Sequence, residues 1–66
     1  MSVAKHIEIT ADSEKSFEDA IQAGITKASE TVKGIRSAWV KDQQVMVTDG
    51  NVTLYRVNIK VTFVLG

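Results

Sequence analysis

Residues 54–65 alternate between apolar and polar side chains almost without interruption. Successive side chains of a β-strand point to opposite faces of a sheet, so a period of two predicts a strand with one dry and one polar face. The odd positions are Tyr55, Val57, Ile59, Val61, Phe63 and Leu65, and the polar even positions are Arg56, Asn58, Lys60 and Thr62. We expect this segment to be the central strand against which the other elements pack.

A first strand and one helix are predicted before it. Residues 3–10 favour a strand, which we expect to end where Asp12 and Ser13, both good helix N-caps, appear. Residues 14–33 carry apolar side chains at steps of three and four, which predicts one amphipathic helix. Gly24 is a poor helix former and indicates close approach of the helix to the sheet.

A second strand is predicted after a left-handed helix stop at Gly34. In residues 35–48 the apolar side chains change parity, from Ala38 and Val40 to Val45 and Val47. A parity change inside a strand indicates a bulge, here within residues 41–44. Asp49-Gly50 is a strong hairpin signal leading into the last strand. The predicted fold is α+β, in the order β-α-β-β, with a three-stranded antiparallel sheet wrapped on one helix.

One helix can cover only one face of this sheet, so the other face is where we look for function. Ser37 and Trp39 alternate with the apolar positions of their strand and therefore share the polar face with Arg56. A tryptophan beside an arginine suits a flat aromatic ligand, and it suits a subunit contact equally well. Arg56 itself fits either a salt bridge to a neighbouring subunit, through Asp42 or a helix carboxylate, or an anion clamp.

The composition narrows the class of protein. Sixty-six residues without proline, linker or repeat indicate a single domain over residues 1–66. A chain this short has a marginal core, and without cysteine it lacks disulfides, so self-association is the expected source of further stability. Eight basic and eight acidic residues cancel, which argues against nucleic-acid binding. No apolar run is long enough to span a membrane and no signal peptide is apparent, so a cytoplasmic location is expected.

Catalytic and metal-binding patterns are weak. There is no cysteine, no histidine placed with a carboxylate and a nucleophile, and no glycine-rich phosphate loop, so we do not expect an enzyme. His6 alone is a poor metal site. The acidic residues Asp12, Glu14, Glu18 and Asp19 form either a solvated helix start or part of a calcium site that other chains complete.

Several short segments together resemble one known family. They are residues 13–17 (SEKSF), 20–24 (AIQAG), 49–52 (DGNV) and 55–63 (YRVNIKVTF). In this order, on a chain of this length, they resemble the dodecins, small β-α-β-β proteins that assemble as hollow spheres of twelve subunits and bind flavins. The resemblance covers roughly residues 3–65 and implies a homododecamer that holds riboflavin or FMN.

The resemblance also implies an altered pocket. In flavin-binding dodecins a tryptophan stacks on the flavin ring and a glutamine bonds its polar edge, and these positions align with Ser37 and Arg56. Trp39 falls two residues later on the same face, and Asp42 aligns near a pocket-lining position. The ligand-binding candidates are therefore Ser37, Trp39, Asp42 and Arg56. The alternative is a flavin-free structural or calcium-linked dodecamer, similar to the calcium dodecins that lack the stacking tryptophan.

Overall fold

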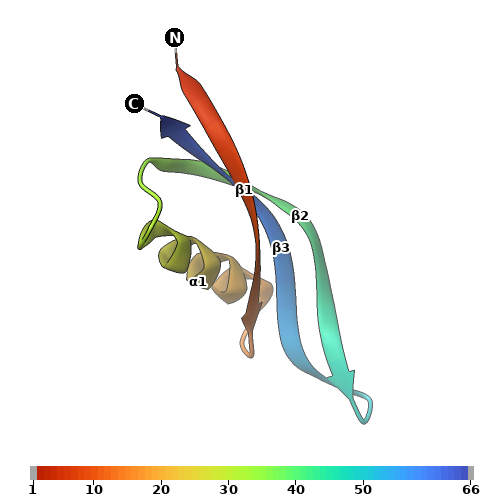
Figure 1. The fold of residues 1–66 in the computed structure, drawn as a ribbon. Helices are drawn as coiled ribbons and strands as arrows, with labels where there is room; N and C mark the ends of the chain where they lie inside the picture. Colours follow the sequence, from red (N-terminus) through yellow and green to blue (C-terminus); the bar gives the residue numbers. More distant parts are fainter. Residues whose placement is uncertain (1, 66) are drawn as a thin grey trace.

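The computed structural model describes residues 2–65 as one antiparallel sheet with a helix on one of its faces (Figure 1). The elements are β1 (Val3–Ser13), α1 (Phe17–Ser29), β2 (Ile35–Thr48) and β3 (Asn51–Leu65). The strand order is β1-β3-β2, and both neighbours of β3 run antiparallel to it. The predicted β-α-β-β fold with a central last strand is confirmed.

The core lies between α1 and the dry face of β3. Val57, Ile59 and Val61 are fully buried there, together with Ala20 of the helix. Gly24 lies where a β-carbon would come within 3.1 Å of the Ala11 side chain, so the predicted close approach of the helix to the sheet is confirmed. The remaining hydrophobic residues of the core are only partly buried, because one short helix covers only part of a long sheet.

The start of the helix differs from the prediction. β1 continues through residues 11–13, and Ser16 is the N-cap, with its hydroxyl accepting from the Asp19 N–H at 3.0 Å. The pairing of Asp12 with Arg56 and of Ser13 with Tyr55 on β3 outweighs the local capping tendency of these two residues. Ser13 still organises the turn, since its buried hydroxyl accepts from the Lys15 N–H.

The end of the helix also differs. The helix ends at Ser29, and the Val32 N–H still donates to the Ala28 carbonyl at 2.9 Å in a final turn. Gly34 has a φ of +80°, as predicted, but its carbonyl accepts from the Val64 N–H at 3.0 Å instead of closing the helix. A β-carbon at Gly34 would lie 2.9 Å from the Val64 carbonyl oxygen, so the glycine permits β2 to enter the sheet.

The predicted bulge and hairpin are present in β2 and β3. The register shifts between Val40 and Asp42, which leaves Lys41 as the extra residue and changes the parity of the strand. Asp49 and Gly50 form the turn, with φ of 52° and 79°, as a primed hairpin turn requires. This two-residue turn places the start of β3 at Asn51, before the predicted start at residue 54.

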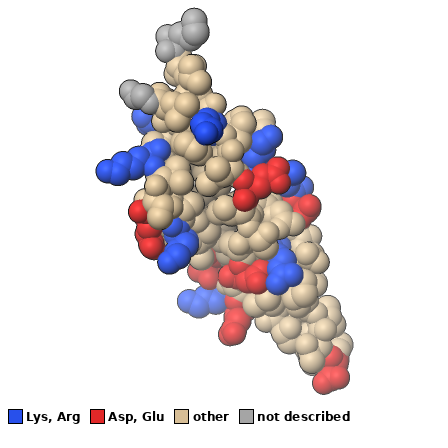
Figure 2. All heavy atoms as spheres, viewed as in Figure 1, with Lys and Arg blue, Asp and Glu red and all other residues tan. Residues whose placement is uncertain are grey.

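The molecule is long for its size. Its principal extents are 51 × 20 × 13 Å, and its radius of gyration is 13.5 Å, whereas a compact domain of this length should have about 11 Å. The arm formed by β2 and β3 is largely uncharged in Figure 2 and exposes Val45, Val47 and Val52. Between residues 2 and 65, α1 falls short of the length and apolarity needed to span a membrane.

Candidate functional site

The polar face of the sheet, opposite α1, is organised as four rows that cross all three strands. Each row takes one residue from β1, one from β3 and one from β2. We name the rows by their β3 residues: they are His6–Thr62–Ser37, Glu8–Lys60–Trp39, Thr10–Asn58–Asp42 and Asp12–Arg56–Gln44. Adjacent rows are two residues apart along β3, or roughly 6.6 Å.

Trp39 is the exposed aromatic group of this face. Its relative exposure is 65%. The Lys60 Nζ lies 5.7 Å from the centroid of the indole, within the range of a cation–π contact. The His6 ring stacks on the indole with centroids 6.3 Å apart and an interplanar angle of 26°, and its Nδ1 is 2.9 Å from the Thr62 hydroxyl. The indole thus has two side-chain neighbours, while much of it still faces solvent.

The Lys60 row also contains an ion pair with the bulge residue. The Lys41 Nζ donates to Glu8 Oε1 at 2.9 Å. This hydrogen bond lowers the pKa of the Glu8 carboxyl and raises that of the Lys41 ammonium. Glu8 is the register partner of Lys60, but its carboxylate bonds to Lys41 instead. Within the described residues, Lys60 therefore forms no salt bridge and lies on the indole.

The Asn58 row is a chain of side-chain hydrogen bonds. The Thr10 hydroxyl donates to Asn58 Oδ1 at 2.7 Å, and Asn58 Nδ2 donates to Asp42 Oδ1. Together with Glu8 and Lys41, these side chains line a hollow of about 190 Å³ on the sheet surface. Asp42 is therefore a pocket-lining residue, and one of its oxygens is already hydrogen-bonded within the chain.

The Arg56 row is closed by an ion pair. Arg56 Nε and Nη2 donate to the two carboxylate oxygens of Asp12 at 2.7 and 3.0 Å. The hydrogen bond lowers the pKa of the Asp12 carboxyl and raises that of the Arg56 guanidinium. Within the chain, Arg56 is therefore paired with Asp12, and the predicted salt bridge to a neighbouring subunit, through Asp42 or a helix carboxylate, stays a prediction. The reason for the pairing with Asp12 is the extension of β1, which brings Asp12 directly opposite Arg56.

The four predicted site residues share the polar face but do not converge. Ser37, Trp39, Asp42 and Arg56 lie one in each row. The rows that contain Trp39 and Arg56 are four residues apart along β3, or roughly 13 Å. Within one chain, therefore, the tryptophan does not lie beside the arginine as expected. Ser37 and Arg56 are roughly 20 Å apart by the same measure.

Two residues adjoining Trp39 were not predicted as site residues. His6 and Lys60 lie 33 and 21 positions away from Trp39 in the sequence, and only the strand register brings them together. The sequence did indicate the face on which they lie, because His6 and Lys60 occupy even positions in strands whose odd positions are mostly apolar. This alternation places both side chains on the polar face, but it does not show which row each belongs to.

The acidic residues near the helix start do not gather into a metal site. Asp12 binds Arg56, and Asp19 accepts from the Ser13 hydroxyl at 2.6 Å. Among residues 2–65, no group of three or more histidine, aspartate or glutamate side chains is placed to hold an ion. A calcium site built on this cluster therefore needs oxygen ligands from further chains.

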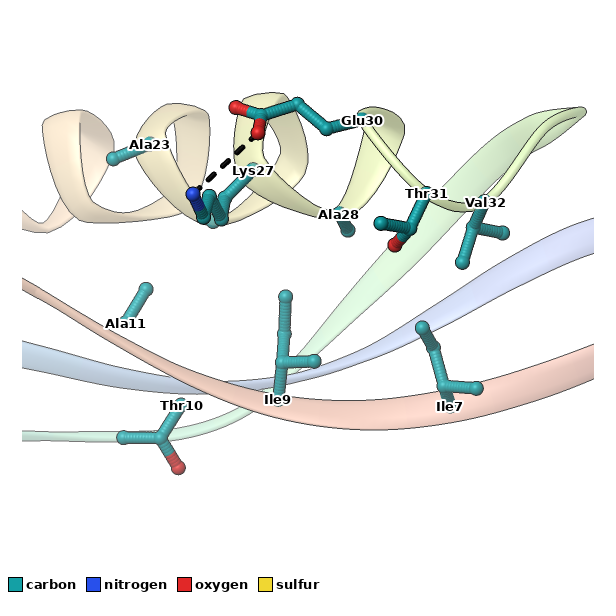
Figure 3. A pocket seen from close by; sticks show the side chains of 11 residues that line it. Ile7, Ile9, Thr10, Ala11, Ala23, Lys27, Ala28, Glu30, Thr31 and Val32 are labelled. Carbon is teal, nitrogen blue, oxygen red and sulfur yellow. Dashed lines mark hydrogen bonds and ion pairs between the residues drawn. The ribbon is translucent and has the colours of Figure 1, made fainter.

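A second surface feature is an apolar groove between α1 and β1, with a volume of about 560 Å³. Ile7, Ile9 and Ala11 point from β1 toward Ala28 and its neighbours on the helix side, while Thr10 points away (Figure 3). The Lys27–Glu30 ion pair, at 3.4 Å, lies at its rim. The groove exposes apolar side chains that this chain alone does not cover.

Comparisons with known proteins agree on one family. The family model described as Dodecin matches residues 3–66. A single-residue variant of the dodecin of Thermus thermophilus is 30% identical, with a TM-score of 0.93, and the match covers 100% of this chain and 98% of that chain. The dodecin of Streptomyces davaonensis is 26% identical, with a TM-score of 0.93 and coverage of 98% and 96%.

A calcium-associated relative is also similar. The calcium dodecin of Mycobacterium tuberculosis, described as a calcium-chelating antigen with a novel calcium-binding site, is 35% identical, with a TM-score of 0.82. The match covers 94% of this chain and 89% of that chain. A search of the curated proteins found no match.

Proposed function

The chain belongs to the dodecin family of non-enzymatic small-ligand binding proteins, and on this premise we propose that twelve copies form a hollow shell that binds a planar aromatic ligand. The ligand class is flavin, as FMN or riboflavin, and the stacking group is Trp39 in place of the tryptophan that the family carries at the position of Ser37. The role is binding and storage of the ligand, without chemical conversion.

The observation that carries this proposal is the state of Trp39. An indole with 65% relative exposure, on a sheet face away from the core, contributes little to the folding of a single chain. Its neighbours on the polar face are the His6 ring and the Lys60 ammonium. An accessible indole suits stacking with a flat ring, because it offers a large aromatic face with only two side-chain torsions to fix on binding.

The shape of the chain supports the assembly. Among residues 2–65, only Ala20, Val57, Ile59 and Val61 form the buried apolar core, while the β2–β3 arm and the groove beside α1 leave apolar side chains uncovered. A domain with so small a core needs further burial to be stable. Association of copies through these surfaces supplies it. Sedimentation should give a mass of twelve 7.2 kDa chains, roughly 86 kDa; a monomer or dimer at micromolar concentration would contradict the assembly.

Ligand binding is tested by titrating FMN and riboflavin with the protein while following flavin fluorescence. Stacking on Trp39 should quench the emission in a saturable manner. Trp39→Ala should weaken the affinity about 5- to 150-fold, since base–aromatic stacking contributes about 1–3 kcal/mol. Trp39→Phe is the matched control, because it keeps an aromatic face, and it should bind within a few-fold of wild type. Unchanged affinity in Trp39→Ala would contradict the role of Trp39.

A second candidate function is a flavin-free, calcium-linked dodecamer. The observation in its favour is the 35% identity to the calcium dodecin, together with Ser37, which offers no aromatic face. In this case sedimentation of the assembly should change between calcium and a chelator, and neither flavin should be quenched. An assembly of the same size and melting temperature in both conditions would exclude the calcium link.

A further inference from the structure

We propose that the Trp39 site selects planar aromatic ligands that carry a phosphate. The groups that recognise the phosphate are Lys60 and His6 beside the indole, together with the hydroxyls of Ser37 and Thr62 in the adjacent row. The inference rests on the proposed function, because it assumes that a ring stacks on Trp39. It goes further by distinguishing FMN from riboflavin, which share the same ring.

The first step is the charge of Lys60. Its register neighbour on β1, Glu8, is bound by Lys41 at 2.9 Å, so within the described part of the chain the Lys60 ammonium forms no salt bridge, although its charge helps to lower the pKa of Glu8. The ammonium lies 5.7 Å from the indole centroid. Since this ammonium lies over the indole, a ring that stacks on Trp39 comes close to a cation, and a negative substituent on that ring gains a favourable contact.

The second step is the row next to the indole. Thr62 and Ser37 are register partners there, and both present hydroxyl groups on the polar face. His6 completes the row, and its Nδ1 contacts the Thr62 hydroxyl, which leaves Nε2 as the ring nitrogen available to a ligand. Hydroxyls, an imidazole and an ammonium are all groups that bond to phosphate oxygens. At the position where flavin-binding dodecins carry the stacking tryptophan, this chain therefore has Ser37, whose hydroxyl is a hydrogen-bond donor.

The third step is the distribution of charged side chains on the two sides of the Lys60 row. Beyond the Lys60 row on the other side lies the Asn58 row, where Asp42 contributes a carboxylate. Lys41 lies beside it, but its charge is offset by Glu8, so the three groups together carry one net negative charge. Arg56, the other cation of β3 on this face, is held by both oxygens of Asp12 and is roughly 13 Å from the Trp39 row. An anionic group attached to the stacked ring is therefore favoured at the Thr62 end, and Lys60 rather than Arg56 is its cation.

The test compares FMN with riboflavin at low salt, by flavin quenching, in wild type and two lysine variants. In wild type FMN should bind about fivefold more tightly, the effect of about 1 kcal/mol from one charge contact near water. Lys60→Gln should reduce this ratio toward one, and Lys60→Arg should keep it. Lys15→Gln, which removes an exposed lysine in the turn before α1, outside the four rows and the groove, is the control and should leave the ratio unchanged.

The outcomes separate this inference from the proposed function. If both flavins bind equally in wild type, or if Lys60→Gln keeps the ratio, the phosphate selection is wrong while the flavin function stands. If neither flavin binds, the flavin function is wrong, and the same comparison is made with 1-naphthyl phosphate and 1-naphthol through the emission of Trp39. A Lys60-dependent preference for the naphthyl phosphate then supports the inference, and equal or absent binding overturns it.

Discussion

The two faces of the sheet differ in how the side chains of β3 interact with their neighbours. On the dry face, Val57, Ile59 and Val61 of β3 are fully buried against one helix and form a single continuous cluster. On the polar face, the alternating residues Arg56, Asn58, Lys60 and Thr62 belong to four rows, each with its own hydrogen bonds or ring contacts. A change on the dry face should therefore affect the whole fold, whereas a change on the polar face should affect mainly its own row and the row next to it.

The largest expected effect is the loss of a core side chain on β3. Ile59→Ala removes buried methyl groups and leaves a cavity beside Ala20, so it should destabilise the protein by about 2–5 kcal/mol. Lys60→Ala, the next residue on the other face, should cost far less. Urea unfolding at one fixed protein concentration measures both. Equal losses would show that the two faces are not energetically distinct.

A smaller effect is expected where α1 approaches the sheet. Gly24→Val introduces a side chain where a β-carbon already lies 3.1 Å from the Ala11 side chain. Such overpacking should cost about 1–3 kcal/mol. Gln22→Val, on the exposed side of the same helix, carries the same β-branched penalty without the contact. If both variants melt at the same temperature, the close approach is unimportant for stability.

The smallest effect, and one that depends on pH, is expected in the Arg56 row. The pKa of Asp12 is lowered in the folded state, so its contribution to stability is present above the unfolded pKa and is lost as the pH falls through the folded pKa. Asp12→Asn should therefore unfold slightly more easily than wild type at neutral pH, and this difference should vanish in acid.

The matched control for that measurement is Asp49→Asn in the β2–β3 turn, outside the four rows. Urea midpoints of the three proteins from neutral to acid pH, at low salt, make the comparison. High salt should reduce the Asp12 difference, since both partners are about one-third exposed. A difference that persists or grows in acid would mean that the Asp12–Arg56 ion pair does not contribute in the way proposed.

Most of the fold followed from periodicity. The alternation of residues 54–65 predicted the central strand, and the change of parity after Val40 predicted the bulge that the structure places at Lys41. The helix start was misplaced because Asp12 and Ser13 have local capping tendencies, and pairing with a strand more than 40 residues away outweighs them. A local sequence pattern does not show how strongly a segment is stabilised by pairing with a strand that is distant in the sequence.

The sequence predicted which face of the sheet carries the candidate site residues, but not which of these residues lie next to one another. Parity placed Ser37, Trp39 and Arg56 on one side of the sheet, as the structure has them. Which residues are neighbours across strands depends on register, and the bulge at Lys41 shifts that register. For this reason the contacts of Trp39 with His6 and Lys60 emerged only from the three-dimensional arrangement.

The strand order also sets the sequence of events in folding. β1 and β2 are both neighbours of β3 and not of each other, so during synthesis neither has a partner strand until β3 has been made. The two-residue turn makes the β2–β3 hairpin the local and faster pairing, while β1 must close a much longer loop. Pulsed hydrogen exchange should therefore show the amides of β2 and β3 protected before those of β1, which joins last and carries His6 to the indole.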